Sequence, residues 1–95
     1  MNTILKKEMS NFAIGDNPIP LISLLKDSWW TPKLGFKLLG KWALRLELHT
    51  LGWRENEEII NQLMGSEFWF LYWEKSIRGG HHYFRIITEF KRGGD

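Results

Sequence analysis

Apolar and polar residues alternate over residues 42–49, which is typical of a β-strand with one buried face. The preceding residues 33–41 fit either a partner strand or a helix. A helix would align the basic side chains of Lys33, Lys37, Lys41 and Arg45 in one stripe. Two glycines in this window, Gly35 and Gly40, disfavour a long helix. We therefore predict a hairpin over about 33–50 that turns near Gly40.

A Gly-Gly pair at 79–80 lies between two β-prone runs and predicts a second hairpin, over about 67–91. A two-residue turn would pair Arg78 with His81. The first run, residues 68–73, is aromatic on both faces of the strand that it would form, so its outer face needs a cover. That face supplies the candidate binding residues, namely Phe68, Phe70, Tyr72, Tyr83, Arg78 and Arg85.

Helical spacing of apolar residues appears in three segments, at about 3–13, 20–30 and 53–64. The first of them, within residues 1–17, is expected to be either a short helix or a flexible tail. The expected fold is α+β, with an antiparallel sheet of about four strands and two or three helices packed mainly on one face. We expect residues 1–95 to form a single small domain.

Composition narrows the function classes. A hydrophobic share of 43% excludes a disordered chain, and the six Trp, six Phe and two Tyr are residue types enriched at interfaces. A net charge of +2 does not favour a nucleic-acid partner, and the absence of cysteine excludes disulfides and thiolate chemistry. No apolar run resembles a signal peptide or a membrane span, so we expect a cytoplasmic protein that does not bind membranes.

No cofactor or metal motif occurs, so neither ligand is expected. His81 and His82 are consecutive in a predicted strand, and their side chains should point to opposite faces. Residues 79–85 resemble the Gly-Ser-His-His-aromatic-Arg turn of HicA-type mRNA interferases, with Gly80 in place of the serine. The resemblance covers about seven residues, and it implies a catalytic role for His81 as an alternative.

The sequence thus favours a small non-catalytic binding, adaptor or inhibitor-type protein. It would use the aromatic sheet face to form a homodimer or to hold a protein partner. The alternative is a nucleic-acid-binding domain or small RNase centred on the hairpin that contains His81. The first interpretation assigns no catalytic residue, and the second assigns His81.

Overall fold

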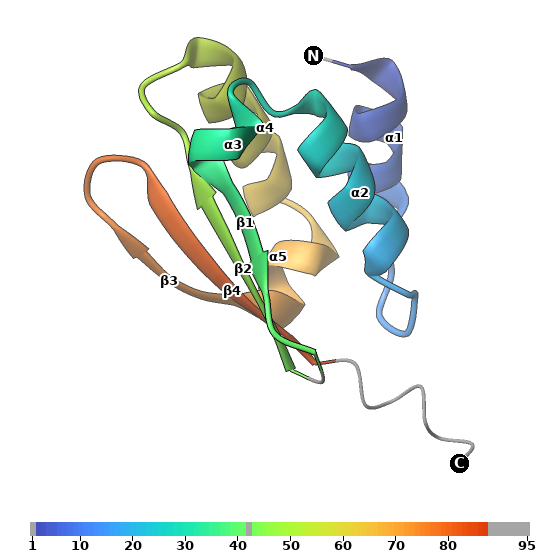
Figure 1. The fold of residues 1–95 in the computed structure, drawn as a ribbon. Helices are drawn as coiled ribbons and strands as arrows, with labels where there is room; N and C mark the ends of the chain where they lie inside the picture. Colours follow the sequence, from blue (N-terminus) through green and yellow to red (C-terminus); the bar gives the residue numbers. More distant parts are fainter. Residues whose placement is uncertain (1, 42, 88–95) are drawn as a thin grey trace.

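The computed structural model describes residues 2–41 and 43–87. Within them, four strands form one antiparallel sheet in the order β1-β2-β4-β3 (Figure 1). The strands are β1 (Phe36–Leu39), β2 (Ala43–His49), β3 (Trp73–Ile77) and β4 (His81–Ile87). The predicted α+β class and its four-stranded antiparallel sheet are confirmed.

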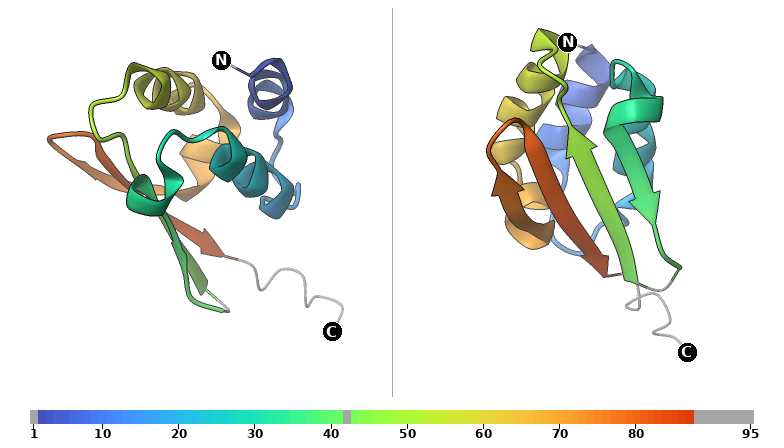
Figure 2. Two further views of the ribbon diagram at one scale, coloured as in Figure 1. Left: turned by 45° about the horizontal axis from the view of Figure 1, so that its top comes forward. Right: turned by 60° about the vertical axis from the view of Figure 1, so that its left-hand side comes forward.

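Five helices accompany this sheet in the described part of the chain. They are α1 (Thr3–Asn11), α2 (Ile19–Ser28), α3 (Pro32–Gly35), α4 (Arg54–Met64) and α5 (Glu67–Tyr72). The three predicted helices correspond to α1, α2 and α4, and the two short helices are additional. Figure 2 shows α1, α2, α4 and α5 behind one face of the sheet, with no ribbon in front of the other face. Within the segment 1–17, Thr3–Asn11 form α1, and the Asn2 side chain caps this helix by accepting hydrogen bonds from the Ile4 and Leu5 amides.

The core lies between the sheet and the helices. Alternate residues of β2 and β4 point inward, which explains the period-two pattern of the sequence. The inward side chains Leu46, Leu48, Phe84 and Ile86 are buried, and they belong to one cluster with the apolar stripes of the helices. The helical members of that cluster are Leu5, Met9, Leu21, Ile22, Leu25, Ile59, Ile60, Leu63 and Phe68.

The prediction that residues 68–72 form a strand is wrong. They lie in α5, which begins after Ser66, and the Ser66 hydroxyl accepts a hydrogen bond from the Trp69 amide at 3.3 Å. The Phe68 and Tyr72 rings, one helical turn apart, also lie 5.0 Å from each other. A capped turn and a contact within it outweigh the strand propensity of the aromatic side chains.

The second hairpin therefore begins at Trp73, and its register differs from the prediction. Ile77 pairs with His81 across a three-residue turn, Arg78–Gly80, instead of Arg78 pairing with His81 across two glycines. The additional turn residue shifts the pairing by one and moves Lys75 and Ile77 to the side of the sheet that faces away from the helices. The predicted hairpin segment 88–91 lies outside the described residues.

The first hairpin is confirmed as an antiparallel pair, in which Phe36 lies opposite Leu48. Its strands are shorter than predicted, because residues 32–35 form the single turn of α3. The helical alternative for the rest of the segment, 36–39, is thereby excluded. Position 42, within the predicted hairpin, lies outside the described residues.

Candidate functional site

The face of the sheet that points away from the helices is here called the outer face. Strand alternation and pairing assign it residues from all four strands. Its members are Lys37 and Leu39 of β1, Ala43, Arg45, Glu47 and His49 of β2, Lys75 and Ile77 of β3, and His81, Tyr83, Arg85 and Ile87 of β4. None of the described helices covers this face (Figure 2). The exposed side chains there, among them Arg45, Lys75 and Arg85, are available to a ligand or partner.

The two central strands, β2 and β4, place several charged and titratable residues of the outer face directly opposite one another. Arg45 lies opposite Arg85, Glu47 lies opposite Tyr83, and His49 lies opposite His81. Like charges in directly opposed positions of neighbouring strands repel. Arg45 is partly neutralised by Glu74, whose carboxylate lies 3.7 Å from its Nη1. The sheet thus places two exposed arginines at directly opposed positions, and one of them is ion-paired with Glu74.

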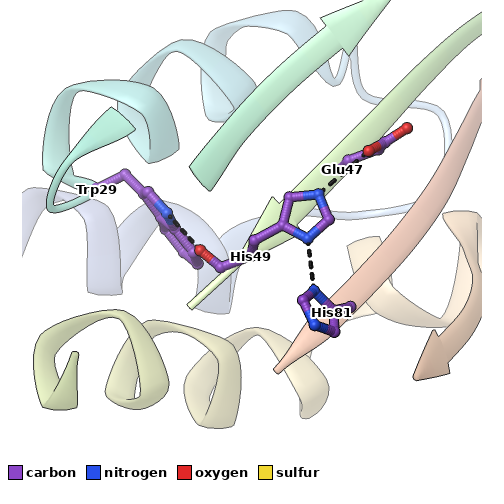
Figure 3. Close-up of polar contacts among 4 residues, drawn as sticks. All are labelled: Trp29, Glu47, His49 and His81. Carbon is purple, nitrogen blue, oxygen red and sulfur yellow. Dashed lines mark hydrogen bonds and ion pairs between the residues drawn. The ribbon is translucent and has the colours of Figure 1, made fainter. Parts of the chain in front are cut away.

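Three titratable side chains form a hydrogen-bonded series at the other end of these strands (Figure 3). The Nδ1 atoms of His49 and His81 lie 2.8 Å apart, and Nε2 of His49 lies 3.1 Å from Oε1 of Glu47. The His49 and Glu47 side chains are only 13% and 19% exposed. Since an ionised carboxylate can only accept, the hydrogen on His49 sits on Nε2, and one proton is shared between the two Nδ1 atoms. His49 is thereby oriented by Glu47 and aimed at His81.

The backbone under this series is fixed from the helical side. The indole N–H of buried Trp29 donates to the carbonyl oxygen of His49 at 3.2 Å (Figure 3). Gly35 makes this close approach feasible, because a Cβ at that position would overlap both the His49 carbonyl oxygen and the Trp29 indole nitrogen. The amide of Thr50 donates to the carbonyl oxygen of Gly80 at 2.9 Å and joins the ends of the two strands. The backbone at His49 and Thr50 is therefore hydrogen-bonded both to the helical layer and to the turn before β4.

Tyr83 lies beside the histidine series. Its ring centroid is 5.8 Å from that of His49 at an interplanar angle of 82°, and the Lys75 ammonium lies 5.2 Å from the Tyr83 ring centroid. An ammonium at this distance from an aromatic ring is attracted by the electrons of its face. The centre of the outer face thus combines one aromatic ring with cations.

The six predicted binding residues are not brought together. Tyr83 and Arg85 lie on the outer face as predicted, and Arg78 lies in the turn that leads into β4. Phe68 is completely buried, and Phe70 is 80% exposed on α5, which packs on the opposite side of the sheet. Tyr72 packs edge-on against Phe12 and Phe68, and burial raises the pKa of its hydroxyl.

The structure brings the alternative residue, His81, together with two residues that the sequence analysis did not select. His49 and Glu47 lie at two of the polar positions in the alternating segment 42–49. Their proximity to His81 depends on the pairing of β2 with β4, which joins segments 32 residues apart. The one signal in the sequence that could have identified His49 and Glu47 is the alternation of polar and apolar residues in β2, which places both on its polar face.

His82 points inward, as its alternation with His81 predicts. Its Nδ1 lies 2.7 Å from the Ser76 hydroxyl, and its ring packs against Trp69. Desolvation by burial lowers the pKa of His82, and the nearby His81 and His49 act in the same direction while Glu57 opposes them.

This lowered pKa predicts a pH-dependent stability. A histidine with a depressed folded-state pKa contributes stability above its unfolded pKa of about 6.5, and the contribution is lost as the pH falls toward the folded value. We expect the free energy of unfolding to fall between about pH 7.5 and pH 5.5, and to fall less in His82→Gln. Urea denaturation of both proteins at the two pH values measures the difference. An identical pH dependence in the two proteins would contradict the assignment.

Within residues 2–41 and 43–87, no cluster of three histidine or acidic side chains is arranged to hold a metal ion. None of the helices in the same residues has the length and apolar character needed to cross a membrane. Comparison of the chain with models of known protein families, with curated proteins and with solved structures gave no match.

Proposed function

We propose that the outer face of the sheet binds single-stranded nucleic acid. The observation that supports this proposal best is the direct opposition of Arg45 and Arg85 on a face that no described helix covers. Both arginines are exposed, and Glu74 pairs with Arg45 in the free protein. A phosphate backbone would satisfy both, because guanidinium groups bind phosphate oxygens in pairs.

The local charge of the face agrees with this proposal better than the charge of the whole chain. The outer strand positions carry four cations, Lys37, Arg45, Lys75 and Arg85, and a single carboxylate, Glu47. Glu74 adds a second carboxylate through its ion pair with Arg45. Charges elsewhere on the molecule are screened by salt over about 8 Å. The face is therefore locally positive although the chain as a whole carries a charge of only +2.

Tyr83 supplies the second element of such a surface. Tyr83 is half-buried. On the outer face of β4 it lies two residues from Arg85 on one side and two residues from His81 on the other. Aromatic rings on open sheets stack single-stranded bases, and they do so with little sequence preference. We expect the nucleic-acid strand to run along β2 and β4, with one base stacked on Tyr83 and one phosphate bound by Arg45 and Arg85.

The test is the salt dependence of binding to a short fluorescein-labelled oligouridylate, measured by fluorescence anisotropy. The double variant Arg45→Ala/Arg85→Ala should bind more weakly and should flatten the plot of log affinity against log salt by about 1.4, since each single-strand phosphate contact contributes about 0.7. The control Lys6→Ala/Lys7→Ala removes the same charge from α1, on the other side of the sheet, and should leave the slope unchanged. Equal effects of the two double variants, or no binding at low salt, would refute the proposal.

A second candidate is protein association through the same face, either with a partner or with a second copy. Its support is the exposure of three aliphatic side chains there, since Leu39, Ile77 and Ile87 are 51%, 49% and 37% exposed. Exposed apolar groups of this kind are typical of interfaces. Native mass spectrometry would then show a complex that Ile77→Glu dissociates. An assembly state that Ile77→Glu does not alter would exclude this candidate.

A further inference from the structure

We infer that protonated His81 is a second phosphate ligand on the outer face, so that binding of single-stranded nucleic acid tightens as the pH falls. This inference rests on the proposed function and adds a phosphate site and its regulation to it. It is carried by a series of hydrogen bonds in which Glu47 and His49 hold one ring nitrogen of His81 (Figure 3). The other ring nitrogen, Nε2, is left for a ligand.

The hydrogen bonds of this series run in one direction. Nε2 of His49 donates to the Glu47 carboxylate at 3.1 Å, so Nδ1 of His49 carries a lone pair and accepts. Nδ1 of His81, 2.8 Å away, is therefore the donor of the contact between the two rings. A neutral His81 then has its lone pair on Nε2, and that atom takes up the next proton. The added proton thus leaves the contact between the two Nδ1 atoms intact.

Nε2 of His81 is open to solvent. It has no hydrogen-bond partner among residues 2–41 and 43–87, and in that part of the chain every fully buried side-chain nitrogen and oxygen has one. The proton that it takes up becomes a hydrogen-bond donor on a positive ring, and such donors bind phosphate oxygens strongly.

The rest of the series stabilises the charge that this proton brings. A protonated His81 donates to His49, which in turn donates to Glu47, and a carboxylate placed behind a histidine in this way favours the imidazolium. The His49 and Glu47 side chains are only 13% and 19% exposed, so salt screens them less than it screens exposed charges. Protonation also neutralises the series, because its only other charge is that of Glu47. The repulsion of a phosphate by this carboxylate is thereby offset.

The elements packed around His81 carry charges of both signs. Three cations and two carboxylates nearly cancel, so one proton on His81 is a large part of the local charge. His82 points to the inner face, and burial lowers its pKa. The charged and titratable groups are Glu47 and His49 of β2, His82 and Tyr83 of β4, Lys75 of β3, Lys37 of β1, Arg78 of the turn and Glu57 of α4.

His81 is a phosphate site separate from the arginine pair. His81 and Arg85 lie four residues apart on the outer face of β4, a separation of about 13 Å at 3.3 Å per residue. A single phosphate cannot contact both. Tyr83 lies between them, so a strand with one phosphate at Arg45 and Arg85 and one base on Tyr83 continues toward His81. The two sites therefore hold different phosphates of one bound strand.

A single proton limits the size of the effect. A phosphodiester stays negative over the pH range in which histidines titrate, so a pH dependence of binding arises in the protein. Because the phosphate binds the charged form of His81 better, phosphate and proton favour each other's binding equally. The affinity should rise as the pH falls, by at most about tenfold per pH unit, and should level off once His81 is charged in the free protein.

The experiment measures binding of a rhodamine-labelled oligouridylate by fluorescence anisotropy at pH 7.5, 6.5 and 5.5 and constant ionic strength. We expect binding about tenfold tighter at pH 5.5 than at pH 7.5, from the uptake of one proton. His81→Gln should bind like the unaltered chain at pH 7.5 and should lose the increase at lower pH. His81→Asn provides a second polar substitution, and circular dichroism at each pH shows whether the variants are folded.

Two further variants separate the proton-linked site from structure. Glu47 is a positioning residue, because it acts on His81 through His49. Glu47→Gln should shift the rise in affinity to lower pH, since an amide stabilises the imidazolium less than a carboxylate does, and a merely structural role would not move this pH profile. His82→Gln changes the neighbouring histidine on the inner face and should keep the full increase.

Calorimetry of the unaltered chain gives a measurement that needs no variant. The heat of binding at pH 6.5 in two buffers of different ionisation enthalpy yields the number of protons taken up with the oligouridylate. We expect an uptake of a fraction of one proton, because His81 is partly charged before binding at this pH and more fully charged after it.

The possible results are distinguishable. Proton uptake, with an increase in affinity that both His81 variants abolish and His82→Gln retains, supports the inference. Binding without proton uptake, or an increase that persists in the His81 variants, overturns the inference and leaves the proposed binding function intact. A failure to bind the oligouridylate at any of the three pH values overturns the proposed function and the inference together.

Discussion

Phe68→Ala should lower the free energy of unfolding by about 3–5 kcal/mol, the loss typical of a large aromatic side chain removed from a core. Phe68 is completely buried, and its ring lies 5.5 Å from Phe12 and 5.9 Å from Phe84, so it joins α5 to the first helical segment and to β4. Domains of this size are stable by only about 5–15 kcal/mol in total. The variant should therefore be close to unfolding at room temperature, as measured by urea denaturation followed by circular dichroism.

Phe70→Ala is the matched control, because it removes the same side chain from the same helix. Phe70 is 80% exposed, so its replacement should change the free energy of unfolding by no more than about 0.5 kcal/mol. A strand over residues 68–72 would place both rings on one face and would make the two variants similar. Equal losses in the two variants would therefore contradict the helical assignment.

The parts of the fold that the sequence predicts well are those with one clear period. The alternation over β2, the inward and outward residues of β4, and the apolar stripe of α4 are each determined by a single buried face. In these segments local preference and burial favour the same structure. This agreement explains why the class of the fold and the faces of the central strands are correct.

Segment 67–72 is different, because its residues are almost all apolar and carry no period that separates a helix from a strand. Its structure is decided by Ser66, whose hydroxyl caps α5, and by the burial of Phe68 against elements distant in the sequence. Aromatic residues alone favour a strand. The capping signal is a single residue, Ser66. It does not by itself outweigh the strand preference of the aromatic residues, and the helix is favoured only when Phe68 is also buried in the core.

The candidate site could not be predicted because it lies between two hairpins. Each hairpin can be inferred from its own turn, but the sequence does not indicate that β2 and β4 are neighbours at the centre of the sheet. That neighbourhood is what brings His49 to His81. The additional turn residue at Arg78 likewise decides which face Lys75 occupies, and the glycine pair alone favours a two-residue turn.

Asn56→Ala should lower the free energy of unfolding by on the order of 3 kcal/mol, although it removes only one small amide. Asn56 is completely buried in α4 and bonds three backbone groups, the amide and carbonyl of Trp30 at 2.8 and 3.1 Å and the carbonyl of Thr50 at 3.2 Å. Alanine leaves these groups without their partner. Asn61→Ala, on the exposed side of the same helix, should cost less than about 0.5 kcal/mol in the same denaturation experiment.

Asn56→Asp distinguishes lost hydrogen bonds from lost packing, because it keeps the shape of the side chain. Its carboxylate still accepts from the Trp30 amide, but it faces the carbonyl oxygens of Trp30 and Thr50 with a negative charge. Burial and these oxygens raise the folded-state pKa of the introduced acid above about 3.9, so the variant should lose stability as the pH rises through that raised value. A protonated carboxyl can donate again at low pH, and part of the stability should return there. A loss of stability that is the same at all pH values would mean that Asn56 acts through packing and not through the bonds that hold Thr50 beside His49.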